Sequence, residues 1–170
     1  MELSAVDRHI PIVKTLHWPT EHATQVFAEA LAAQNSLHHA FIALHGDLGA
    51  GKTTLVRHLL RALGVEGRIK SPTYAVVEPY ELPGLNIWHF DFYRFANPRE
   101  WEEAGFRDIF ASPGLKLTEW PEKAGPLLPT ADLDITLHAL SETARTATLS
   151  ANSNVGVAML RAATEQGSTQ

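Results

Sequence analysis

The feature that most constrains this chain is the stretch at residues 46–53, whose sequence G-D-L-G-A-G-K-T fits the pattern G-x-x-x-x-G-K-[ST] of a phosphate-binding loop. Residues 39–44 before it form an apolar run typical of a strand, and residues 53–63 after it carry apolar side chains at helical spacing. A phosphate-binding loop requires this order of strand, loop and helix. The sequence therefore predicts that the chain binds a nucleoside triphosphate.

The residue types in the loop explain how it would hold a phosphate. Glycines at positions 46, 49 and 51 let the backbone turn tightly and present successive N–H groups to the ligand. The helix that follows adds the positive end of its dipole. Lys52 supplies a mobile cation, and the hydroxyl of Thr53 is suited to Mg²⁺.

Composition excludes several other classes of protein. The 170 residues are enough for one domain with its own core, and the absence of cysteine excludes a disulfide framework, a thiolate zinc site and a cysteine nucleophile. The net charge of −5 argues against a surface that grips nucleic acid by itself. No signal peptide and no apolar run of roughly 20 residues is found, so we expect a cytoplasmic protein.

The histidines show no H-x-x-x-H pair, and His45 and His58 are interpreted as surface residues or neighbours of the nucleotide.

Periodicity and turn signals divide the rest of the chain into short elements. We expect a lead-in at residues 1–11, a folded domain at 12–151 and a partly flexible tail at 152–170 that frays from Ala162 onward. Thr20 is expected to cap one helix and Asn97-Pro98 to start another. The expected elements are strand 12–17, helix 20–33, strand 39–44, helix 53–63, a hairpin of strands 74–80 and 85–93, helix 97–105, strand 115–120 and a strand pair at 135–140 and 146–150.

Helices that alternate with strands around a phosphate-binding loop predict an α/β fold. We expect a single-domain P-loop sandwich with a mixed, partly parallel sheet flanked by helices. Ligands of such sheets bind at the carboxyl ends of the strands. Polar residues that end other strands should therefore face the same crevice as Lys52.

Thr73 follows Ser71-Pro72 and precedes an apolar strand, which leaves two interpretations. One is an ordinary turn, because the proline restricts the backbone before it. The other is a switch loop whose hydroxyl senses the γ-phosphate or the metal.

Asp91 lies in the run H-F-D-F-Y-R, where strict alternation places His89, Asp91 and Tyr93 on one face and the two phenylalanines on the other. The polar face could be solvated. Alternatively, the carboxylate points at the nucleotide and orients the attacking water or the water shell of a metal. Arg94 could pair with Asp91 or cap the end of the strand.

Glu119 ends another predicted strand, directly before Trp120-Pro121. It could be a plain surface glutamate. P-loop proteins, however, place a second metal-coordinating acid at such a position, because Mg²⁺ prefers hard oxygen ligands. Trp120 is expected to support the site by packing.

Four motifs in this order and spacing, G-D-L-G-A-G-K-T-T, S-P-T-Y, H-F-D-F-Y-R and T-E-W-P-E, resemble the bacterial TsaE (YjeE) family. The resemblance covers about residues 15–150. Tyr74 stands where the family usually has phenylalanine, and Thr118 where it often has an aliphatic residue. Neither departure removes a chemical group.

The resemblance implies an ATPase component of the machinery that makes threonylcarbamoyladenosine in tRNA. Its cofactors would be ATP and Mg²⁺. Thr53 and Glu119 would hold the metal, Asp91 would position water, and Lys52 and Thr73 would complete the catalytic set. The partners would be proteins of the TsaB and TsaD types, with tRNA reached only through the complex. The residues that would bind ATP are Asp47, Leu48, Gly49, Ala50, Gly51, Lys52, Thr53 and Thr54.

Three other functions share the loop. A small-molecule kinase needs a lid that carries arginine, whereas Arg99 and Arg107 are scattered. A GTPase needs a guanine-reading motif of the N-K-x-D type, which is absent. A nucleotide-gated binding module would use the same residues as a slow ATPase, so only rates separate these two.

Overall fold

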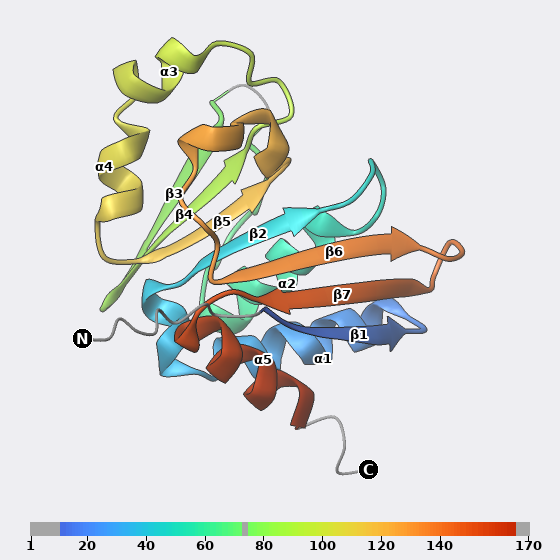
Figure 1. Ribbon diagram of the computed structural model, residues 1–170. Coiled ribbons are helices and arrows are strands. Elements are labelled where there is room, and N and C mark those ends of the chain that lie inside the picture. Colours follow the sequence, from blue (N-terminus) through green and yellow to red (C-terminus); the bar gives the residue numbers. More distant parts are fainter. Residues whose placement is uncertain (1–10, 73–74, 166–170) are drawn as a thin grey trace, which may run out of the picture.

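The computed structural model describes residues 11–72 and 75–165. Its centre is one sheet of seven strands in the order β1-β7-β6-β2-β5-β4-β3 (Figure 1). The strands are β1 (Ile12–Trp18), β2 (Phe41–His45), β3 (Val77–Leu82), β4 (Leu85–Asp91), β5 (Leu115–Glu119), β6 (Leu133–Ala139) and β7 (Arg145–Ala151).

The sheet is parallel in its middle and antiparallel at both edges. β2 pairs in parallel with β5 and β6, and β4 pairs in parallel with β5. β7, β1 and β3 add antiparallel pairs. The predicted mixed, partly parallel α/β sheet is confirmed.

Helices cover the sheet in two groups. The helices are α1 (Glu21–Ala32), α2 (Lys52–Leu63), α3 (Pro98–Glu103), α4 (Phe106–Ala111) and α5 (Asn154–Glu165), with short 3₁₀ turns η1 (Asn35–His39), η2 (Pro121–Lys123) and η3 (Gly125–Leu127). α1, α2 and α5 pack into the main core on one face. α3 and α4 lie beside the β3-β4-β5 end of the sheet, away from those three (Figure 1).

Alternation along the strands assigns the two faces. On β2, Ile42 and Leu44 point into the core under α1 and α2, whereas Phe41 and Ala43 join a small cluster on the opposite face. On β4, Phe90 belongs to an aromatic cluster with Trp101 and Phe106 of the α3–α4 layer. Side chains that leave β2, β4 and β5 on the α2 side can therefore reach the loop between β2 and α2.

Most predicted elements exist, with shifted ends. The expected helix at 97–105 begins as predicted, because the Asn97 side chain accepts a hydrogen bond from the Arg99 N–H. Thr20 does occupy the position before α1, but its side chain makes no capping hydrogen bond. The hairpin turns at Pro83-Gly84, and its second strand ends at Asp91 rather than Tyr93. The short helix α4 has no counterpart among the predicted elements.

The C-terminal segment differs from the expected tail. The sequence predicts a partly flexible tail at residues 152–170, yet Asn154–Glu165 form α5, with Met159 and Leu160 fully buried in the main core. The domain therefore extends past residue 151, and the helix continues through Ala162. A short amphipathic helix of this kind is stabilised by docking more than by its own propensity, which explains why local sequence underestimates it.

Within residues 11–72 and 75–165, none of the helices combines the length and apolar character required to traverse a bilayer.

Candidate nucleotide-binding site

The loop between β2 and α2 contains glycines with positive φ angles, which other residues rarely adopt. Gly46 has a φ of +141°, and a Cβ there would lie 2.6 Å from the carbonyl oxygen of Leu137. Gly51 has a φ of +107° and forms the left-handed cap directly before α2. The first turn of α2 contains no acidic residue, so its free N–H groups keep their positive potential for an anion.

Lys52 is folded back onto the loop. Its Nζ donates hydrogen bonds to the carbonyl oxygens of Gly46 and Asp47, and it lies 4.0 Å from the centre of the Trp120 ring. Burial lowers the pKa of Lys52, and the nearby carboxylates, Glu119 foremost, partly oppose this shift. The acceptors of the Lys52 ammonium are thus neutral backbone carbonyls, whose place a phosphate could take.

Trp120 has a left-handed backbone, with a φ of +56°, which is rare for a large side chain. Its ring lies against that of Tyr93 at a centroid distance of 5.0 Å. The Trp120 ring thus packs between Tyr93 and the Lys52 ammonium.

Glu119 is buried at the end of β5, with only 2% of its surface exposed. Its Oε1 accepts a 2.8 Å hydrogen bond from the Thr53 hydroxyl, and its Oε2 lies 2.6 Å from Nε2 of His89. The interpretation as a plain surface glutamate is therefore wrong. Two oxygens suited to a hard cation, from Thr53 and Glu119, meet beside the phosphate-binding loop.

Asp91 lies at the end of β4, directly across the parallel pairing from Glu119. Its Oδ2 accepts a 2.9 Å hydrogen bond from the Ser71 hydroxyl, and its Oδ1 accepts one of 3.0 Å from the Tyr93 N–H. The predicted alternation is correct, but His89 is fully buried, so this face of β4 is not a solvated surface. The bond from Ser71 brings the first residue of the S-P-T-Y motif to the site.

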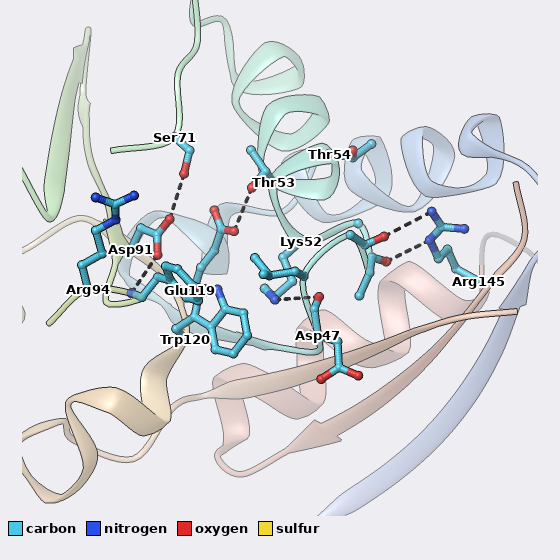
Figure 2. Close-up of a pocket in the computed structure, with 15 residues that line it drawn as sticks. Asp47, Lys52, Thr53, Thr54, Ser71, Asp91, Arg94, Glu119, Trp120 and Arg145 are labelled. Atoms are coloured by element: carbon cyan, nitrogen blue, oxygen red, sulfur yellow. Dashed lines mark hydrogen bonds between the residues drawn. The ribbon is translucent and has the colours of Figure 1, made fainter. Parts of the chain in front are cut away.

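These residues surround one open cavity of about 410 Å³ (Figure 2). Of the predicted site residues, Thr73 lies outside the described part of the chain. The others all line the cavity. Its walls are Asp47, Leu48, Gly49, Ala50, Gly51, Lys52, Thr53, Thr54, Ser71, Asp91, Tyr93, Arg94, Glu119, Trp120 and Arg145.

Arg145 is a wall residue that sequence reasoning missed. From the start of β7 its Nε donates a 2.9 Å hydrogen bond to the carbonyl of Ala50, and Nη2 donates a longer one to Gly49 (Figure 2). Its Nη1 also donates to carbonyls of its own hairpin, including Ser141 at 2.8 Å. The guanidinium thus joins the β6–β7 hairpin to the phosphate-binding loop. No local motif marks this arginine, because its loop partners Ala50 and Gly49 lie 95 and 96 residues earlier in the chain.

A second cavity of about 260 Å³ adjoins the first and shares Ala50, Gly51, Thr54 and Arg145 with it. Its other walls come from the end of β1, the start of α1 and the β6–β7 hairpin. They are Trp18, Thr20, Glu21, Thr24, Leu137, Glu142 and Thr143. Sequence reasoning missed this cavity too, since it joins segments from both ends of the chain.

The two singled-out histidines, His45 and His58, line neither cavity. His45 pairs with Asp134 at 2.7 Å, and His58 lies 3.2 Å from Glu21. Both are partly exposed residues with a carboxylate neighbour.

A family model and individual relatives of this chain carry the same name. The family model "Threonylcarbamoyl adenosine biosynthesis protein TsaE" matches residues 18–147. A protein of Haemophilus influenzae called tRNA threonylcarbamoyladenosine biosynthesis protein TsaE is 44% identical over 130 residues, which are 76% of this chain and 82% of that protein. The protein of the same name from Bacillus subtilis is 32% identical over 143 residues, or 84% and 89% of the two chains.

A solved structure agrees with the fold. The crystal structure of Bacillus subtilis YdiB matches with a TM-score of 0.73 and 25% identity, covering 94% of this chain and 99% of that one. The family match spans the phosphate-binding loop, Asp91, Glu119 and Arg145. The chain therefore belongs to the TsaE family.

Proposed function

We propose that this protein binds ATP with Mg²⁺, hydrolyses it, and thereby serves the machinery that makes threonylcarbamoyladenosine in tRNA. The observation that carries the proposal is the hydrogen bond between Thr53 and Glu119, which joins the phosphate-binding loop to the acid that ends β5. The name of the relatives supports the pathway. The alternatives are a small-molecule kinase and a nucleotide-gated binding module.

The loop and Lys52 would bind the β- and γ-phosphates of ATP. The N–H groups of the loop and of the first turn of α2 donate to phosphate oxygens, and the ammonium supplies a compensating charge. Lys52 must first leave the carbonyls of Gly46 and Asp47. An ionised phosphate is the stronger acceptor, so this exchange is favourable.

The residues at the start of α2 and at the end of β5 fit a magnesium ion. The Thr53 hydroxyl and the Glu119 carboxylate are hard oxygen donors, and Mg²⁺ needs few protein ligands because it keeps several waters. When bound, Mg²⁺ would neutralise charge on the phosphates during transfer. Thr53 and Glu119 are the residues that would hold it.

Asp91 would orient the attacking water. Its carboxylate lines the cavity on the strand next to Glu119, and Ser71 and the Tyr93 N–H fix its two oxygens. Thr73, two residues after Ser71, would act as the switch that responds to the γ-phosphate.

The second cavity would hold the base and ribose. It adjoins the phosphate cavity at Gly51 and Thr54, and it combines the Trp18 ring with polar groups such as Glu21 and Glu142. Nucleotide sites typically join an apolar wall to a few polar groups in this way.

The transfer of the threonylcarbamoyl group would belong to partner proteins of the TsaB and TsaD types. The acidic net charge gives this chain little attraction for tRNA by itself, so tRNA would be reached through the complex. Hydrolysis by the isolated chain would be slow, and the partners would stimulate it. The location would be the cytoplasm.

The test is ATP turnover by the protein alone, with the two partner proteins, and with partners plus unmodified tRNA. We expect turnover to rise in the complex and Lys52→Ala to abolish it. Phosphate transfer from ATP to a small molecule would favour the kinase. Modification supported equally by a non-hydrolysable ATP analogue would favour the binding module. A rate that ignores the partners would indicate an independent enzyme.

A further inference from the structure

His89 is a fully buried imidazole directly behind Glu119 of the candidate site. It leaves β4 on the α2 side of the sheet, and its Nε2 lies 2.6 Å from Oε2 of Glu119. Among the described residues, its Nδ1 has no hydrogen-bond partner. His89 does not line the nucleotide cavity, so it cannot touch the phosphates directly.

The hydrogen bond has a defined direction. An ionised carboxylate can only accept hydrogen bonds. Nε2 of His89 therefore carries the hydrogen and donates the hydrogen bond to Oε2 of Glu119. The tautomer with the proton on Nε2 also leaves only a lone pair, not an N–H, at the unpartnered Nδ1. The imidazole is thereby set as a donor toward Glu119.

The carboxylate of Glu119 is consequently held at both oxygens. Oε2 is bonded to His89 inside the protein, and Oε1 is bonded to Thr53 at the cavity. With Oε2 occupied, the carboxylate offers a single oxygen to a ligand beside Thr53. Acids and histidines that hold metal ions commonly need such an outer partner to fix their orientation.

We propose that His89 is a positioning residue that fixes Glu119 so that Oε1, and not Oε2, faces a divalent cation next to Thr53. This rests on the proposed function, because it assumes that Thr53 and Glu119 hold the metal. The alternative is a role in stability alone, in which His89 merely satisfies a buried acid.

The test is the affinity for Mn²⁺ in the presence of ADP, measured by electron paramagnetic resonance, because ADP avoids turnover. We expect His89→Leu to weaken Mn²⁺ binding by about 10- to 100-fold, the usual effect of losing an outer partner of a metal ligand. ADP affinity in EDTA should stay within about threefold of wild type. The matched control is His45→Gln, which alters a histidine–carboxylate pair of similar length that lies outside the cavity.

Two conservative variants keep the test decisive if His89→Leu does not fold. The side-chain amide nitrogen of glutamine reaches about as far as Nε2 of histidine, whereas that of asparagine is one methylene shorter. We expect His89→Gln to restore most of the Mn²⁺ affinity and His89→Asn to behave like the leucine variant. Both place an amide in the same buried position, so their difference isolates the bond to Glu119.

The outcomes separate this inference from the function on which it rests. Wild-type Mn²⁺ affinity in His89→Asn or His89→Leu would overturn the positioning role alone. Equal loss in the glutamine and asparagine variants, in proportion to their loss of thermal stability, would assign His89 to stability and overturn it as well. A wild-type protein that binds neither ADP nor ATP would overturn the proposed function, and this inference with it.

Discussion

Asp91 and Glu119 are register partners at the carboxyl ends of the adjacent parallel strands β4 and β5. Their surroundings differ. Glu119 is buried and bonded to Thr53 and His89, whereas Asp91 is bonded to Ser71 and to the Tyr93 N–H at the cavity wall. This difference in surroundings is the basis for the separate roles proposed above, in which Glu119 holds the metal and Asp91 orients water.

For Asp91→Asn we expect turnover to fall by about 10²- to 10⁴-fold, the usual range for a positioned acid–base group. ATP affinity should change little, because asparagine keeps the size of the side chain and one of the two oxygens that accept hydrogen bonds from Ser71 and the Tyr93 N–H. Turnover and the equilibrium affinity for ATP are measured separately. Asp108→Asn, at an exposed position on α4, is the control. Unchanged turnover in Asp91→Asn would remove this residue from the reaction.

For Glu119→Gln we expect the Mg²⁺ concentration that gives half-maximal turnover to rise at least about tenfold. The amide loses the negative charge that a hard cation requires. A Mg²⁺ titration at saturating ATP measures the effect. Glu122→Gln is the control, because that side chain is 52% exposed and lies outside the candidate metal pair. A titration curve equal to that of wild type would transfer the metal role to another residue.

Arg145 should be needed for the shape of the phosphate-binding loop. We expect Arg145→Met to weaken ATP binding by about tenfold or more, since charged hydrogen bonds each contribute about 1.5–3 kcal/mol. Arg145→Lys should recover only part of the affinity, because lysine lacks the planar fork that contacts Ala50 and Ser141 together. ATP titrations compare both with Arg161→Lys on the exposed side of α5. Full recovery in the lysine variant would mean that charge alone matters.

ATP affinity should fall at alkaline pH because of Lys52. Burial lowers its pKa in the free protein, and bound phosphate would favour the charged ammonium. As pH rises through the lowered pKa, free protein loses the proton that binding requires, so affinity falls by at most about tenfold per pH unit. In Lys52→Arg the side chain stays charged, and affinity should be flat over the same range. Parallel profiles for the two proteins would exclude Lys52 as the titrating group.

Substitution of Gly156 tests whether α5 is packed tightly against the rest of the domain. A Cβ at this position would lie 1.9 Å from the carbonyl oxygen of Asp132. Alanine in a helix is ordinarily better than glycine by about 1 kcal/mol, but here the clash should prevail and destabilise the protein by about 1–3 kcal/mol. Denaturant unfolding compares Gly156→Ala with Val155→Ala, at a partly exposed position of the same helix. A stabilised Gly156→Ala protein would show that α5 can leave the sheet.

The sequence alone determined the parts of the protein that depend on neighbouring residues. These parts are the phosphate-binding loop, the start of α2 and the hairpin turn at Pro83-Gly84. They follow from the conformations that glycine and proline favour and from the spacing of apolar residues over a few turns of chain. The face of β4 that carries Asp91 followed from alternation in the same way. These features are local because the backbone and its nearest side chains decide them.

Only the tertiary structure decided which distant groups meet. The burial of His89 against Glu119, the contact of Arg145 with the loop and the docking of α5 join segments far apart in the chain. Sequence pattern assigns a side chain to a face, but the order of strands and the packing between layers decide what that face covers. The free energy that orders these contacts comes from burial shared by the whole domain, and no single segment carries it.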